Sequence, residues 1–166
     1  MLVTLSPVTP DEVDDLQAVI ESDPEYVERV TGLPPGPADA QSLLMMRPPD
    51  LPEERKTVLA VRCDGVVVGI VDVLRGYPER HVAYLGLLQI RGDLQRRGLG
   101  HAAHDALLDV VGDWTEIQRL RLAVLATNSE AAEPFWRALG YQPVGAPVPY
   151  AYDKLETTAQ RFELAL

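Results

Sequence analysis

Apolar residues recur along this chain at two spacings, of which the first is helical. Apolar positions three and four residues apart mark one face of a helix, and they run through 13–20 and again through 103–114. Thr9, Pro10 and Glu12 precede the first stretch as an N-cap, a first-turn proline and a capping-box glutamate. The pattern therefore predicts a helix opening after Thr9 and a longer helix over the second stretch.

Three further helices are predicted from their start and stop signals. One begins at Ser22 and ends at Gly32, a short one covers 38–46, and one runs from Asn128 to Leu139. The loops LPPGP and RPPDLPEER lie on either side of the short helix, because proline interrupts regular structure.

The second spacing is that of β-strands, in which apolar residues alternate with polar ones or run without a break. Such segments lie at 2–5, 57–62, 66–75, 82–90 and 119–126, and two more lie within YQPVGAPVPY and RFELAL. VAYLGLLQI (82–90) is apolar on both faces and is therefore predicted to be a central strand. Strict alternation along it would place Tyr84, Gly86, Leu88 and Ile90 on one face and Ala83, Leu85, Leu87 and Gln89 on the other.

The elements follow one another in the order β-αα-βββ-α-β-α-ββ, without repeats or linkers. A chain of 166 residues fits a single domain over 1–166, and 46% hydrophobic with 24% charged residues is usual for a globular protein. No apolar run approaches the roughly 20 residues of a membrane span, the N-terminal residues lack the features of a secretion signal, and the single cysteine cannot form an internal disulfide. We therefore expect a soluble, cytoplasmic protein that does not bind membranes.

The charge of the chain limits its partners. A net charge of −10 argues against nucleic acid, since phosphates require a basic surface. Nearly half of the 25 carboxylates lie before residue 55, and this acidic third would attract a cationic substrate, although it would equally keep the surface soluble. The sequence leaves the oligomeric state open, a homodimer included.

The segment QRRGLG (95–100), between the central strand and the longer helix, carries a chemical signal of its own. The first turn of a helix leaves amide groups without partners, and its dipole attracts an anion. Glycines at 98 and 100 remove side chains that would hold a phosphate away from the backbone. The segment therefore predicts a diphosphate site. Arg96 and Arg97 would contact the phosphates or be solvated, because only their amides are needed.

Two other phosphate-binding motifs fit the segment less well. A P-loop requires Gly-Lys-Ser/Thr, which does not follow these glycines. GLGHAA (98–103) matches the dinucleotide pattern G-x-G-x-x-A, but seven residues separate Ile90 from Gly98, whereas that pattern follows its strand directly. His101 and His104 are interpreted as surface histidines, since no further metal ligand follows from the sequence. We expect no metal.

QRRGLG also fits Q/R-x-x-G-x-G/A, and here the sequence resembles the GNAT superfamily of acyl-CoA N-acyltransferases. Other features agree in order: a strand ending Leu88-Gln89-Ile90, the helix after the turn, a strand ending in Asn128, and FWRALGY (135–141), which resembles the family's Phe-Tyr-x-x-Leu-Gly-Phe/Tyr segment. The resemblance implies an α/β (α+β) fold with a mixed, mostly antiparallel sheet of six to seven strands flanked by helices.

The resemblance also implies where the cosubstrate lies. Acetyl-CoA, or another acyl-CoA, is expected between two splayed parallel strands at 83–90 and 119–126. The contacts it implies are the backbone of Leu88, Gln89 and Ile90 at the pantetheine and the thioester carbonyl, Gln95, Arg96, Arg97, Gly98, Leu99, Gly100 and His101 at the diphosphate, and Asn128 and Trp136 along the cofactor arm. Asn128 has the capping of a helix as its alternative role.

Catalytic residues are not evident from the sequence. The carboxylate that many family members carry on the strand before the motif is missing, and the family's tyrosine acid falls at Trp136, which cannot protonate a thiolate. Trp136 is expected to pack beside pantetheine or in the core. Three candidates are retained: Tyr84, Tyr141, and Asp72, whose pKa burial would raise unless an arginine pairs with it.

These features predict transfer of an acetyl group from acetyl-CoA to a primary amine of a small molecule or a peptide. The missing carboxylate and Trp136 leave an alternative open, an acyl-CoA-binding sensor or interaction domain with little or no turnover. A dinucleotide-dependent oxidoreductase is the more distant alternative.

Overall fold

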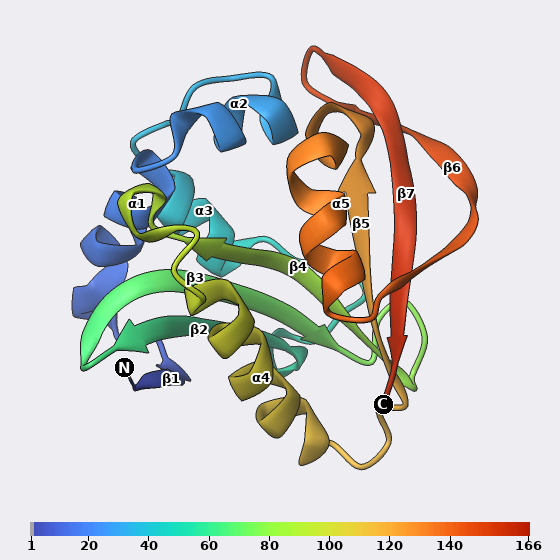
Figure 1. Cartoon of the computed structure of the whole chain (residues 1–166), viewed down its shortest axis with the longest axis horizontal. Helices are drawn as coiled ribbons and strands as arrows, with labels where there is room; N and C mark the ends of the chain where they lie inside the picture. Colours follow the sequence, from blue (N-terminus) through green and yellow to red (C-terminus); the bar gives the residue numbers. More distant parts are fainter. Residues whose placement is uncertain (1) are drawn as a thin grey trace.

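The computed structural model describes residues 2–166 and arranges seven strands in one sheet (Figure 1). The strand order is β1-β2-β3-β4-β5-β7-β6, and every neighbouring pair is antiparallel except β4 and β5. The strands are β1 Val3–Pro7, β2 Lys56–Cys63, β3 Val66–Arg75, β4 Val82–Ile90, β5 Arg119–Leu125, β6 Gln142–Tyr152 and β7 Leu155–Ala165. The predicted mixed, mostly antiparallel sheet is confirmed.

The α-helices in the described part of the chain are α1 Val13–Glu21, α2 Pro24–Thr31, α3 Asp39–Met45, α4 Leu99–Gly112 and α5 Ser129–Ala138. The short helix predicted over 38–46 is confirmed as α3, so three helices lie between β1 and β2 and not the two in the predicted order. The capping box is present, with the Thr9 amide donating to Glu12 Oε1 at 3.0 Å. It caps a short 3-10 turn, so that α1 itself begins at Val13.

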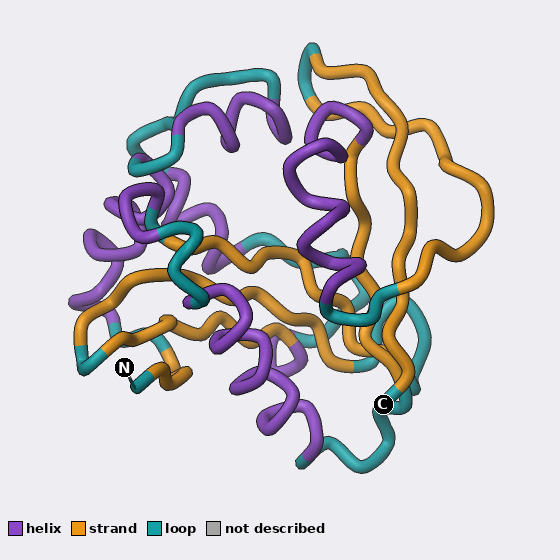
Figure 2. The backbone as a smooth tube through the Cα atoms, viewed as in Figure 1, coloured by secondary structure: helices purple, strands orange, loops and turns teal. Residues whose placement is uncertain are grey.

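Helices cover both faces of the sheet (Figure 2). Two apolar cores lie between these helices and the sheet. On the first face, which we call the α1–α3 face, Leu16 and Val19 of α1 form a buried core with Ile70 of β3. On the opposite α4 face, α4 packs against the inner residues of β2 to β5, and α5 adds Ala132 and Trp136 to the edge of that core. The two faces therefore meet different side chains of β4.

A bulge in β4 changes which of its side chains share a face. Val73 on β3 pairs with Leu85 and Asp72 pairs with Leu87, so Gly86 is an extra residue on β4. The residues of β4 in the core of the α4 face are Ala83, Leu85, Leu88 and Ile90. Leu87 packs on the α1–α3 face instead. The strict alternation predicted for 82–90 is therefore wrong, because one extra residue inverts a pattern of period two.

Candidate active site

β4 and β5 lie side by side only where they begin. Their parallel pairing joins 82–84 to 119–121 and then stops, although β4 continues to Ile90 and β5 to Leu125. Figure 1 shows β5 running away from β4 beyond this pairing. We call this feature the β4–β5 divergence. Beyond residues 84 and 121, the edge of β4 that faces β5 and the edge of β5 that faces β4 are not hydrogen-bonded to each other.

The unpaired edge of β4 presents backbone groups of Leu88 and Ile90. The Arg91 amide donates to the Val68 carbonyl on β3 at 2.8 Å, and alternation along the strand turns the backbone of Leu88 and Ile90 the other way, toward the β4–β5 divergence. By the same alternation the backbone of Gln89 faces β3, and its buried side chain donates to a carbonyl of α1 at 3.2 Å. Of the three residues predicted here, Leu88 and Ile90 turn backbone groups toward the β4–β5 divergence, and the carbonyl of Ile90 already accepts from Gln95 Nε2.

The turn before α4 has the geometry of an anion site. Arg96 and Gly98 both adopt left-handed backbone conformations, with φ of 62° and 82°. Ala102 donates its amide to the Gly98 carbonyl at 3.1 Å, whereas the amides of 99–101 precede any acceptor in the helix. A Cβ at Gly98 would meet nothing within 4 Å, so the turn is open on that side. Left-handed residues in such a turn form the concave set of amides that binds phosphates.

Side chains fix this turn to the N-terminal helices. Gln95 Nε2 donates to the Ile90 carbonyl at 3.0 Å and to Asp23 Oδ2, at the start of α2, at 2.9 Å. The Gly92 amide donates to Ser22 Oγ at 2.9 Å, and a Cβ on Gly92 would lie 2.3 Å from the Ser22 carbonyl oxygen. Gly92 is not among the residues predicted for the site, and its only signal in the sequence is a glycine two residues after the end of a strand. Gln95 acts here as an anchor of the turn.

Of the remaining residues predicted in the turn, some are exposed to solvent and one permits close packing of two helices. Arg96, Arg97 and His101 are exposed. A Cβ on Gly100 would lie 3.1 Å from the Phe135 ring, so this glycine permits α4 and α5 to approach each other. Gly98 is thus the open glycine of the pair, and Gly100 is a packing position.

Asn128 does not cap α5 with its side chain. Its Oδ1 accepts from Arg29 Nε on α2 at 2.8 Å, and the neighbouring Thr127 Oγ1 donates to the Arg29 carbonyl at 2.5 Å. Capping, the alternative role considered for Asn128, is therefore wrong. The observed contact ties the end of β5 to α2, and contact of Asn128 with a cofactor stays a prediction.

Tyr141 lies in the core of the α4 face, away from solvent. The side chain is 1% exposed, and its hydroxyl is 2.9 Å from Nε2 of His104, which is equally buried. Burial raises the pKa of Tyr141 and lowers that of His104. The interpretation of His104 as a surface histidine is wrong, and the burial of Tyr141 argues against a catalytic role. Trp136 packs edge to face against both rings, as expected for a partly buried core residue.

Asp72 and Tyr84 lie on the α1–α3 face, since their neighbours in sequence belong to the opposite core. Tyr84 is in the last residue pair before the β4–β5 divergence, and burial raises its pKa. Asp72 is 8% exposed, and Lys56 Nζ donates to both of its oxygens at 3.0 Å. The partner is a lysine and not the arginine that the sequence suggested. Burial raises the pKa of Asp72, and Lys56 opposes that rise.

Among residues 2–166, no group of three or more His, Cys, Asp or Glu side chains is placed to hold a metal ion. Within the same residues, no helix has both the length and the apolar character needed to cross a bilayer.

The sheet is mixed, and its one parallel pair diverges beside a helix whose first amides have no partner within the helix. The family resemblance implies this arrangement for an acyl-CoA N-acyltransferase. The sequence agrees, because the model of the acetyltransferase (GNAT) family matches residues 22–141. The chain belongs to this family and is an acyl-CoA-dependent N-acyltransferase.

Solved structures share this fold along nearly the whole chain. An acetyltransferase from Thermus thermophilus is 27% identical with a TM-score of 0.76, and the match covers 100% of this chain and 98% of that one. The ribosomal-protein-S18-alanine N-acetyltransferase from Escherichia coli is 18% identical with a TM-score of 0.69, covering 99% and 94% of the two chains, and this likeness concerns the fold alone. A search of curated proteins finds no match.

Proposed function

We propose that the protein transfers an acetyl group from acetyl-CoA directly to a primary amine of a small molecule or a peptide. The family supports acyl transfer, and its description as an acetyltransferase family, shared by the similar Thermus protein, favours acetyl as the acyl group. The observation that carries the proposal is the placement of two sets of backbone donors, the amides of 99–101 and the free edge of β4 at Leu88, beside the β4–β5 divergence.

The residues present fit a ligand that carries a diphosphate and a thioester. The open turn at Gly98 leaves room for phosphate oxygens, which the amides of 99–101 would bind. The backbone N–H of Leu88 would donate to the thioester carbonyl, as the donors of an oxyanion hole do. Acetyl-CoA supplies the activated acyl group, and binding, orientation and proton transfer fall to the chain.

The acceptor must lose a proton before it can attack. A lysine-like amine with a pKa near 10.4 is neutral in about one molecule in 2,500 at pH 7, which corresponds to roughly 4.6 kcal/mol. The site therefore requires a group that binds the ammonium form and takes its proton.

The test is release of free thiol from acetyl-CoA in the presence of a panel of primary amines, with mass spectrometry of the products. We expect thiol release that depends on the amine and a product heavier by one acetyl group. Faster release from longer acyl-CoA esters would contradict the choice of acetyl. Stoichiometric binding of acetyl-CoA in calorimetry, without release of free thiol with any amine, would favour the alternative of an acyl-CoA-binding sensor. Trp136 leaves this alternative open, because it stands where the family has a proton-donating tyrosine.

A further inference from the structure

The Asp72–Lys56 pair is an unusual feature of the sheet interior. Asp72 lies in the middle of β3 between Val71 and Val73, both of which are fully buried. Lys56, at the start of β2, has a side chain only 6% exposed. A buried ion pair contributes little net stability, because desolvation of the two charges offsets their attraction, and apolar residues of similar volume often stabilise a fold as well or better. Stability alone therefore does not explain why the pair is present.

Gly86 opens a path from solvent to the carboxylate of Asp72. The bulge places Gly86 over Asp72, where a Cβ would lie 3.4 Å from Asp72 Oδ2. Gly86 is exposed although it lies in a central strand, because β5 leaves β4 directly after Tyr84. The side chain of Asp72 keeps 12% of its surface exposed. A side chain at position 86 would therefore begin in contact with this carboxylate.

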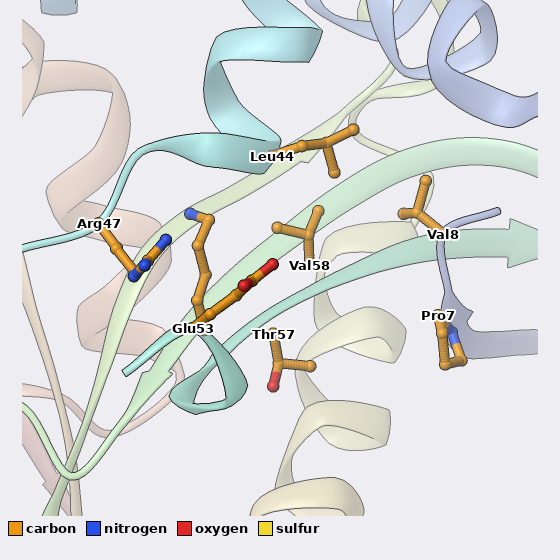
Figure 3. A pocket seen from close by; sticks show the side chains of 8 residues that line it. Pro7, Val8, Leu44, Arg47, Glu53, Thr57 and Val58 are labelled. Carbon is orange, nitrogen blue, oxygen red and sulfur yellow. The ribbon is translucent and has the colours of Figure 1, made fainter. Parts of the chain in front are cut away.

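The opposite side of the ion pair is closed by Lys56. This lysine lines a pocket of about 280 Å³ between β2 and α3, and Figure 3 shows Arg47 and Glu53 pointing into the same pocket. Lys56 Nζ contacts both oxygens of Asp72, and the lining of the pocket includes Lys56 but not Asp72, so the lysine separates the carboxylate from the pocket. A ligand therefore reaches Asp72 from the side of Gly86.

The carboxylate also lies close to the proposed position of the thioester. Gly86 precedes Leu88 by two residues, which corresponds to about 7 Å along a strand. An amine held at Asp72 would thus be within one short side chain's length of the backbone donor at Leu88.

We propose that Asp72, reached past Gly86, binds the ammonium group of the acceptor and takes its proton, and that the acceptor is therefore a cationic primary amine. This inference rests on the proposed acetyl transfer. An N–H bond of the ammonium breaks and an O–H bond forms on Asp72. The neutral amine then forms the C–N bond as the C–S bond breaks, its second proton passes to the departing sulfur, and Asp72 returns its proton to water.

Lys56 is a positioning residue in this scheme. It is the charged group in contact with Asp72, and it holds the carboxylate with Oδ2 toward Gly86. The helices packed over this face present the apolar residues Leu16, Val19, Ile20 and Ala40 together with Tyr26 of α2, whose pKa burial raises. The next titratable side chain on this face of β4 is Tyr84.

The first test is Gly86→Ala, which covers the carboxylate without altering it. The fold should tolerate the methyl group, since 3.4 Å is an ordinary contact and Gly86 does not have a positive φ. With cadaverine as acceptor we expect kcat/KM for the amine to fall roughly tenfold, as small misplacements of a reacting group do, while KM for acetyl-CoA stays unchanged. Gly112→Ala, on α4 where a Cβ meets nothing within 4 Å, is the matched control.

The second test is Asp72→Asn, for which we expect kcat/KM for cadaverine to fall about 100-fold, the usual range for losing a general base. The loss should be smaller with glycinamide, a less basic amine, and the acidic limb of the pH–rate profile should disappear; a structural role alone would produce neither effect.

Normal kinetics in Gly86→Ala, or equal losses of kcat/KM with both amines in Asp72→Asn, would overturn the inference and leave the proposed acetyl transfer unaffected. Absence of amine-dependent thiol release in the wild type would instead overturn the proposed function, and with it this inference.

Discussion

On the α4 side of the β4–β5 divergence the candidate site consists of backbone groups from one continuous stretch, 88–101, whereas on the α1–α3 face it depends on residues from three separate strands. The backbone part depends on two left-handed residues and a helix start, which neighbouring residues specify. The side-chain part requires Lys56 on β2, Asp72 on β3 and Gly86 on β4 to meet. Sites made of backbone are therefore encoded locally, and sites made of side chains depend on the strand register.

The two parts are also joined mechanically. The turn before α4 is held by Ser22 and Asp23, which lie between α1 and α2 and so belong to the helices of the α1–α3 face. Arg29, further along α2, contacts Asn128 at the end of β5. A change at these contacts should affect both sides of the β4–β5 divergence, whereas a change at Gly98 or at Gly86 should affect one side.

The largest effect is expected for Gly98→Asp. The new carboxylate would lie where the amides of 99–101 are expected to hold a diphosphate, and we expect CoA to bind about 100-fold more weakly, equivalent to roughly 2.7 kcal/mol. Gly65→Asp is the control, because Gly65 has a similar φ of 85° and equally open surroundings but lies in the β2–β3 turn. Calorimetric titration with CoA measures both variants. An equal loss of affinity in the two would mean that backbone strain, and not charge at the phosphate site, is responsible.

A smaller effect, on stability, is expected for Gly92→Ala. Its Cβ would lie 2.3 Å from the Ser22 carbonyl oxygen, so the turn must move away from the N-terminal helices. Overpacking of this kind typically lowers the free energy of unfolding by about 1–3 kcal/mol. Urea unfolding provides the measurement, with Gly112→Ala as a variant that should lose no stability. An unaltered unfolding midpoint in Gly92→Ala would show that the contact with Ser22 is not maintained in solution.

The smallest effect is expected at the bridge between α2 and β5. Asn128→Ala and Arg29→Met each remove the same hydrogen bond, and each should lower the free energy of unfolding by about 1 kcal/mol. If Asn128 also holds the cofactor arm, as the family resemblance implies, Asn128→Ala alone should raise KM for acetyl-CoA, by about fivefold for a contact worth about 1 kcal/mol. Steady-state kinetics of the two variants measures KM for acetyl-CoA. Equal KM values in Asn128→Ala and Arg29→Met would mean that Asn128 contributes only its contact with Arg29.

The predictions from sequence succeeded where a signal is local. The capping box at Thr9 and the start of α4 after Gly98 are specified by residues within one turn of each other. The prediction for β4 failed after Gly86, because a bulge is set by the register of β3 against β4 and leaves no mark on the periodicity of β4 itself. His104 was misplaced for a related reason, since a polar residue on a helix is buried only when a partner such as Tyr141 comes from elsewhere in the chain.

The order of the main elements, the family and the position of the glycine turn before α4 follow from residues close to one another in the chain, because helix starts, strand runs and glycine conformations are local. The pairing of Lys56 with Asp72, the proximity of Gly86 to that carboxylate and the burial of Tyr141 follow from the packing of the strands and helices. Exposure, charge pairing and side-chain direction arise from contacts between strands far apart in the chain, and a shift of one residue in their register reverses them.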